Sequence, residues 1–404
     1  MAELRGIEYL RKKLKQKSTR VNLRYTYYEM KNRIRDLGIF DDARFRRIPE
    51  VVGWAPKAVD SLADRLSFRR FKNDRMDITP IFEQNNPDIF FSSAILSALI
   101  ASCSFVYIRK NDDDAVRLEV IDGGNATGII DPTTLLLLEG YAVLERDDAK
   151  QPTVEAYFAP NVVEIYRNGD LTERIEHNVP YALLVPVINR PDARRSFGHS
   201  RISRACMSTI DAALRTLLRS EITAEFYSFP QKWVSGLAQN HDDLDRWKMS
   251  VSALLAFEKD SDGEHPTVGQ FQQSSITPHV DQLRMLASVF AGENGLTLED
   301  LGFQGANPTS AEGIKAAHET LRLQARKAQN DFGSAFLNVG FIAALLRDNL
   351  PYDRAGFYET KAVWNPIFEP DASTFASIGD GIYKINESFP GSVPDDFIAD
   401  FLGL

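Results

Sequence analysis

The sequence predicts an α+β fold, because its helical and β-strand patterns occupy separate stretches of the chain. Two long segments, 203–229 and 278–291, carry apolar residues at helical spacing. Between residues 116 and 175, short apolar runs are separated by turn residues, and Asn168-Gly169 is a strong hairpin signal. With 404 residues, 44% of them hydrophobic, the chain can bury a core shared by about two to four structural units.

The N-terminal part is predicted to be helical before the strands begin. Helices are expected over 4–37 and 54–66. The 20 uncharged residues 89–108 meet the length test for a membrane span, but serines dilute them, and a buried helix running into a strand at 104–110 is the favoured interpretation. The strands that follow are predicted at 116–121, 133–138, 141–146, 154–158, 162–167 and 171–175.

The two long helices are predicted to flank a small strand, helix, strand unit. Pro230 ends the first helix, and the inserted unit has strand patterns at 231–236 and 267–272 around a helix at 244–257. Pro278 opens the second helix, and Gly292 and Gly295 stop it. Three large apolar side chains in the insert are expected to need a partner to bury them: Trp233, Trp247 and Phe257.

A loop over 296–308 and a final long helix are predicted next. Breakers in the loop are Gly302, Gly305 and Asn307-Pro308, and they enclose the uncharged pair Phe303-Gln304. Thr309 and Glu312 have capping-box spacing, so a helix is expected from Ser310 to about Asp348. Unbroken, it would span roughly 58 Å. Gly333 and Gly340 predict a bend or break near its far end.

Charge is distributed unevenly along the chain. The formal net charge is −9, yet residues 1–75 hold 20 Lys/Arg against 10 Asp/Glu, so the rest carries −19. A basic N-terminal run contacts nucleic acid in some proteins, but a solvated or subunit-contacting helical face is favoured. Two cysteines are too few for a disulfide framework, and the first 20 residues lack an apolar signal-peptide core.

No catalytic or metal-binding constellation stands out, and no cofactor is expected. Walker A, Gly-x-Ser-x-Gly and zinc spacings do not occur. The glycine-rich run 123–128 is a conceivable phosphate cradle but is interpreted as a turn, and the acidic run 260–264 as a solvated turn. An apolar seam is predicted along the last helix from two sets of residues spaced seven apart: Ile314, Leu321, Ala328 and Ala335, and His318, Ala325, Phe332 and Val339. His318 lies on this seam and is interpreted as a core or interface histidine.

Several stretches, in order, resemble portal proteins of long-tailed, siphovirus-type bacteriophages, the head-to-tail connector family. The similarity covers roughly residues 20–350 and departs near Trp364-Asn365-Pro366. Its motifs lie at 27–29 with 35–39, 51–63, 198–204, 224–231, 268–271 and 307–312.

This resemblance implies a portal-type fold with a reduced C-terminal crown. By analogy, 1–200 form an α/β wing, 201–230 and 278–293 the two stem helices, and 231–277 a small α/β clip. Residues 294–309 would be a tunnel loop, 310–370 a tunnel/wing helix and wing return, and 371–404 a short crown.

The resemblance also implies a structural function rather than an enzymatic one. Such proteins form a ring, usually of twelve subunits, at one capsid vertex, assembled in the host bacterial cytoplasm. The ring conducts double-stranded DNA during packaging and ejection. Implied partners are the large terminase subunit, the head-tail adaptor and the major capsid or scaffolding protein, with no membrane. Two alternatives remain open: a DNA-binding adaptor that forms no ring, and a metal-dependent nucleic-acid enzyme.

Overall fold

The structure is a computed structural model that describes ten stretches of the chain: 4–33, 51–111, 113–228, 232–235, 267–270, 275–303, 313, 316–350, 352–368 and 372–394. Its helices are α1 (Ile7–Tyr28), α2 (Trp54–Ala63), α3 (Thr79–Glu83), α4 (Pro87–Ala101), α5 (Arg204–Ser228), α6 (Thr277–Asn294), η2 (Glu299–Leu301), α8 (Glu319–Asp348), α9 (Arg354–Phe357) and α10 (Ala372–Ser388). Its strands are β1 (Phe68–Lys72), β2 (Cys103–Lys110), β3 (Val116–Asp122), β4 (Ala126–Ile130), β5 (Leu137–Arg146), β6 (Pro152–Ala159), β7 (Val162–Arg167), β8 (Asp170–Glu176), β9 (Leu184–Ile188), β10 (Lys232–Ser235), β11 (Thr267–Gln270) and β12 (Lys361–Trp364).

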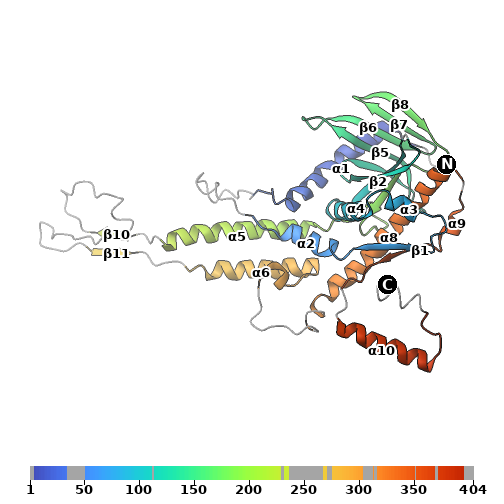
Figure 1. Cartoon of the computed structure of the whole chain (residues 1–404). Coiled ribbons are helices and arrows are strands. Elements are labelled where there is room, and N and C mark those ends of the chain that lie inside the picture. The colour runs from blue at the N-terminus through green and yellow to red at the C-terminus, as the bar shows by residue number, and fades with distance from the viewer. Residues whose placement is uncertain are drawn as a thin grey trace.

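A body of sheets and helices carries a long arm (Figure 1). The paired helices α5 and α6 extend from the body side by side, and the β10–β11 hairpin lies beyond their far ends. Helix α10 lies apart from the sheets. This arrangement confirms the α+β class and both long helices that the sequence predicts, and α6 opens with a proline at its N-terminus. Among the described helices none has the length and apolar character needed to cross a membrane.

Two antiparallel sheets form the centre of the body. Strand order is β3-β2-β9 in one and β4-β5-β6-β7-β8 in the other. Strand β2 is buried from Cys103 to Ile108. Tyr107 packs against Phe158 of the five-stranded sheet, with ring centroids 4.9 Å apart, while α4 and α8 also contact β2. Covered on both faces, β2 is a continuous apolar strand, which confirms the predicted buried helix-to-strand passage over 89–108.

An aromatic cluster joins the beginning and the end of the described chain. Phe68 of β1 stacks on Phe91 of α4 at 4.1 Å, and Phe91 meets Phe336 of α8 edge-on at 4.7 Å. Strand β1 pairs with β12, with Phe68 opposite Trp364. The sequence did not reveal either of these short strands, because each is too brief to show an alternating pattern.

Helix α8 is continuous through Gly333 and Gly340, the two glycines at which a bend or break was predicted. A Cβ on Gly340 would lie 2.6 Å from Ile78 Cδ1, and one on Gly333 would lie 3.1 Å from the Ala362 Cβ. Glycine at these positions lets α3 and β12 approach the helix backbone. The predicted break is therefore wrong. The predicted seam is confirmed, since Leu321, Ala325, Ala328, Phe332, Ala335 and Val339 are all buried.

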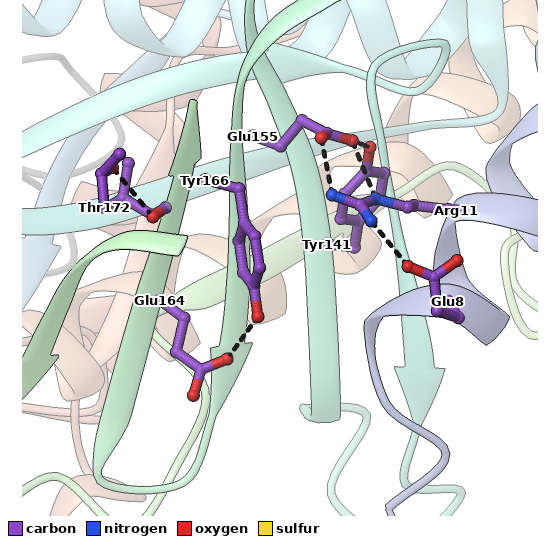
Figure 2. A network of polar contacts seen from close by, with 8 residues as sticks. Glu8, Arg11, Tyr141, Glu155, Glu164, Tyr166 and Thr172 are labelled. Atoms are coloured by element: carbon purple, nitrogen blue, oxygen red, sulfur yellow. Dashed lines mark hydrogen bonds and ion pairs between the residues drawn. The ribbon is translucent and has the colours of Figure 1, made fainter. Parts of the chain in front are cut away.

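Helix α1 is attached to the five-stranded sheet by two buried carboxylates. Glu139 accepts hydrogen bonds from the backbone N–H groups of Arg5 and Gly6, at 2.9 and 3.0 Å, and so caps the start of α1. Glu155 accepts two hydrogen bonds from Arg11, at 3.1 and 2.7 Å, and one from the Tyr141 hydroxyl (Figure 2). Burial and the bond to Glu155 raise the pKa of Tyr141, which stays a neutral donor.

The basic side chains of α1 also contact the body. Lys13 donates to the carbonyl of Gly128 at 2.6 Å, and Arg24 to that of Ala101 at 2.7 Å. The expectation of a solvated face is therefore wrong for these two residues and Arg11, while a subunit-contacting face stays a prediction. Helix α1 is also shorter than predicted, because Met30 adopts φ 56°, in the left-handed region, just after its C-terminus.

Three strand predictions need correction. The segments 133–138 and 141–146 were predicted as two strands, but β5 is continuous from Leu137, and Asp131 holds a turn before it through Thr133 and Thr134. The run 123–128, predicted as a turn, is a turn over 123–125, which confirms that part, but it continues as strand β4 from Ala126. Strand β9 was missed because it contains Pro186; it pairs with β2 alone, the edge position that proline tolerates.

Candidate functional site

The candidate site begins with the paired helices of the arm. Helices α5 and α6 run antiparallel along their length, and near the far end Thr223 Oγ1 lies 3.2 Å from His279 Nε2. The α6 surface carries apolar side chains at half exposure: Met285 is 55% and Val289 50% exposed. These two residues are one turn apart, so they form an apolar strip on one face of α6.

The described end of the arm is the two-stranded β10–β11 ladder. This ladder confirms both predicted strands of the inserted unit. Trp233 lies opposite Gly269, whose missing side chain leaves room for the indole: a Cβ there would be 2.5 Å from the ring. Trp233 is nevertheless 40% exposed. Trp247 and Phe257, the other two residues proposed to need a partner, lie outside the described residues.

The segment after α6 is more ordered at its start than a simple loop. Gly295 ends α6 with φ 66°, Leu296 is buried, and η2 follows. Thr297 and Asp300 cap each other: the Thr297 N–H donates to Asp300 Oδ2 at 2.9 Å, and the Asp300 N–H to Thr297 Oγ1 at 3.2 Å. The expectation of a loop without secondary structure over 296–308 is therefore wrong for its first part.

Gly302 and Phe303 end the described part of this segment. Gly302 has φ 88°, a conformation that side-chain-bearing residues rarely adopt, and it is the C-cap of η2. Phe303 is partly buried and packs against the core, with its N–H donating to the Leu298 carbonyl at 3.0 Å. The remaining residues assigned to the tunnel loop and the helix cap lie outside the described residues: Gln304, Gly305, Asn307, Thr309 and Glu312.

The predicted continuous helix from Ser310 is interrupted at His318. Residues 316–317 are helical, but 318 is a turn and α8 begins at Glu319. His318 Nδ1 is buried and 3.7 Å from Asp300 Oδ2, and the ring lies 6.3 Å from that of Phe368. The histidine therefore links the end of η2 to the start of α8, as a packed residue rather than an isolated base.

Arg201 joins the arm to the body at the base of α5. Its guanidinium donates to three neutral oxygens: the Ala58 carbonyl at 2.7 Å, the Asn294 carbonyl at 2.6 Å, and the Gln324 side chain. These acceptors lie on α2, the C-terminus of α6 and α8. A rigid fork with several N–H donors suits this divergent arrangement, which a lysine ammonium does not reproduce.

The electrostatics of Arg201 follow from its surroundings. Burial lowers its pKa to about 10, and the Arg190 charge acts in the same direction. The guanidinium therefore remains charged at neutral pH while bonded to neutral acceptors, and the side chain fixes the last carbonyl of α6 where the candidate loop departs. The 198–204 motif was identified in the sequence, but no local sequence pattern indicated that Arg201 would bind these three distant acceptors.

Within the described residues, no group of three or more His, Cys, Asp or Glu side chains is placed to hold a metal ion. The acidic run 260–264 lies outside them. What the geometry provides is a rigid junction of four helices from which a projecting arm and a glycine-containing segment depart.

Sequence comparisons with known proteins name one family. Two curated relatives are both called portal protein: that of Mycobacterium phage L5 is 25% identical over 398 residues, and that of Mycobacterium phage D29 is 24% identical over 400. Each alignment covers 91% of this chain and 79% of the relative. A solved structure described as the virion of a native gene transfer agent particle matches with TM-score 0.46 and 12% identity, over 95% of this chain and 99% of that one. The family described as "Phage portal protein, SPP1 Gp6-like" matches residues 7–366, so the chain belongs to the phage portal protein family.

Proposed function

We propose that the chain assembles into a closed ring of about twelve copies that serves as the portal of a phage capsid vertex. The observation that carries the proposal is the projecting α5–α6 arm, whose apolar strip at Met285 and Val289 is half exposed in the single subunit. Helix α10 is similar, since Tyr383 is 69% exposed. Neighbouring copies related by a rotation would cover both surfaces, and contacts between different faces close into a ring.

In this ring each part of the chain takes a place. Residues 1–200 form the outer wing, α5 and α6 the stem, 231–277 the clip, and 371–404 a short crown. The segment 294–309 is the tunnel loop and faces the bore. Arg201 and His318 support this loop from both sides, because one fixes the end of α6 and the other joins η2 to α8.

The ring conducts double-stranded DNA during packaging and ejection. Twelve copies carry about 108 net negative charges, which repel the phosphates and keep the binding of DNA by the conduit weak. The loop residues Gly302, Phe303, Gln304, Gly305 and Asn307 carry no charge, so those that reach the duplex would present neutral groups to it, while Phe303 packs partly against the core. The internal use of Arg11 and Lys13 removes part of the basic surface that a DNA-binding adaptor would need.

The clip is the docking surface for the large terminase subunit and later for the head-tail adaptor. The exposed Trp233 supports this role, and Trp247 and Phe257 would extend the same apolar surface. The wing contacts the major capsid or scaffolding protein. Assembly takes place in the host bacterial cytoplasm, and the product resides in the virion.

A mass measurement on the purified chain tests the ring. Mass photometry should show a species near 545 kDa, twelve times the chain mass of 45.4 kDa. Met285→Asp places a charge in the apolar strip and should shift the population toward smaller species, whereas Met285→Leu should not. A chain that stays monomeric at micromolar concentration would refute the ring.

Binding to free DNA separates the conduit from the adaptor alternative. The assembled ring should bind a short duplex weakly, with little change in affinity between 50 and 200 mM salt. An adaptor making about six phosphate contacts would lose roughly 1,000-fold in affinity over that interval. Steep salt dependence measured by fluorescence anisotropy would therefore contradict the conduit.

A further inference from the structure

A half-open cavity lies between α1, the segment 194–198 and the start of β4. Its volume is about 340 Å³, far above the roughly 15 Å³ that one water needs. Five basic side chains from two separate parts of the sequence line it: Lys17, Arg20, Arg24, Arg194 and Arg195. Among the described residues that line the cavity, none is acidic. The concentration of positive charge is therefore uncompensated within the cavity wall.

Phe197 holds the two basic segments together. The Lys17 ammonium lies 4.1 Å from the centroid of the Phe197 ring, and that of Lys13 lies 5.3 Å from it. Within the described part of the chain, Lys17 has this ring contact but no hydrogen-bond acceptor. Arg24 donates to the Ala101 carbonyl, which leaves its other N–H groups available. The cavity thus holds fixed cations with unused donors.

Two acidic residues close in sequence to the cavity wall, Asp122 and Asp192, are engaged elsewhere. Asp192 accepts hydrogen bonds from the N–H groups of Arg194 and Arg195 and contacts His199 at 2.6 Å. Asp122 accepts from the Gly124 N–H and from Asn125. Burial raises the pKa of the Cys103 thiol, which also lines the cavity, to about 11, so it carries no charge near neutral pH.

Thr127 is an independent sign of a missing ligand. It lines the same cavity and is 1% exposed, and its hydroxyl has no hydrogen-bond partner within the described chain. Buried hydroxyl groups are normally paired, so an unpaired one next to a polar cavity calls for an explanation. Thr127 belongs to the glycine-rich run 123–128, whose resemblance to a phosphate cradle rested on composition alone.

We propose that this cavity is a binding site for a phosphate-class oxyanion, held by Lys17, Arg24 and Arg195 with the Thr127 hydroxyl in its wall. Several converging cations favour a doubly charged anion over a single carboxylate. Burial lowers the pKa of Lys17 and of Arg24, and an anion in the cavity offsets that cost. The anion is either free phosphate or a phosphate of the DNA backbone, and the site does not depend on the ring proposed above.

Phosphate titration of the full chain tests the site. Isothermal titration calorimetry with inorganic phosphate, at constant ionic strength, should show one saturable site per chain. Lys17→Met keeps the apolar stem against Phe197 but removes the charge, and should weaken binding about tenfold or more. Lys12→Met is the matched control, because Lys12 is an exposed lysine of the same helix that does not line the cavity. The control should bind as the unsubstituted chain does.

A second variant and competition experiments complete the test. If Lys17→Met does not fold, Arg195→Gln, on an exposed loop residue, should produce the same selective loss. Competition by a short DNA duplex against phosphate identifies the backbone as the source, whereas no competition identifies the free ion. Sulfate should compete, and acetate at equal ionic strength should not. No saturable phosphate binding, or equal affinity in the Lys17 and Lys12 variants, would overturn the proposal.

Discussion

Replacing Arg201 should loosen the junction between the arm and the body. Arg201→Met keeps much of the side-chain volume but removes the fork, and leaves the Ala58 and Asn294 carbonyls and the Gln324 amide without their donor. An unsatisfied buried acceptor costs about 1–3 kcal/mol, but Gln324 has freedom to turn toward water, and the loss of a buried charge offsets part of the cost. The expected net destabilisation is about 3 kcal/mol.

Thermal unfolding and hydrogen exchange together measure this effect. A loss of about 3 kcal/mol lowers the melting temperature by roughly 6–12 °C for a unit of 150–250 residues. Exchange should also accelerate at the Leu296 amide, which donates to the Ala291 carbonyl in the last turn of α6, the turn that Asn294 ends. The melting temperature of Arg201→Lys should lie between those of the unsubstituted chain and Arg201→Met, since an ammonium does not reach three divergent acceptors.

Arg204→Met is the control, because Arg204 is exposed at the start of α5. It should change stability by no more than about 0.5 kcal/mol. Both variants must be compared at the same oligomeric state, since subunit contacts add to apparent stability. The three hydrogen bonds do not hold the junction if Arg201→Met has the same melting temperature as Arg204→Met and its Leu296 amide is as protected from exchange as in Arg204→Met.

Three further substitutions address other parts of the body. Glu139→Gln weakens the charged cap on α1 and should cost about 1–2 kcal/mol, seen as faster exchange along α1 with unchanged exchange in β2. Gly340→Ala forces a methyl group against Ile78 and should cost about 1–3 kcal/mol by thermal unfolding; a neutral result would mean that α3 moves freely. Burial lowers the pKa of Lys13 to about 8 from 10.5, so the unfolded chain binds more protons between these values and stability rises with pH there. Lys13→Met should reduce that rise, with the remainder coming from Lys17, whose pKa burial also lowers.

Long elements with strong periodicity were the most predictable part of the fold. The seam of α8, both arm helices and the 89–108 passage follow from apolar spacing, which is a local property. The glycines of α8 show where such reasoning fails. Gly333 and Gly340 resemble helix breakers in the sequence, yet each one leaves room for an element distant in the chain, and no local pattern announces that.

The candidate site was less predictable for a similar reason. Gly302 was identified as a conformationally special position, and its φ of 88° confirms it. The hydrogen bonds of the Arg201 guanidinium, the cap made by Glu139 and the Arg11–Glu155 pair were missed, because the partners lie more than 90 residues apart in the sequence. A charged residue with distant partners looks in the sequence like any surface charge. The bore-facing role of the loop residues remains a prediction.

Because β1 pairs with β12, the N-terminal part of the fold cannot be completed until the C-terminal part of the chain has been synthesised. Phe68 reaches its partner Trp364 only when nearly 300 further residues have left the ribosome, so the aromatic cluster stays incomplete until then. A chain interrupted earlier would keep β1 as an open edge with exposed aromatic rings, a substrate for chaperones and proteases rather than for assembly. In the proposed ring, where copies of one chain fill every position, such late closure would let complete subunits assemble and leave truncated ones to be degraded.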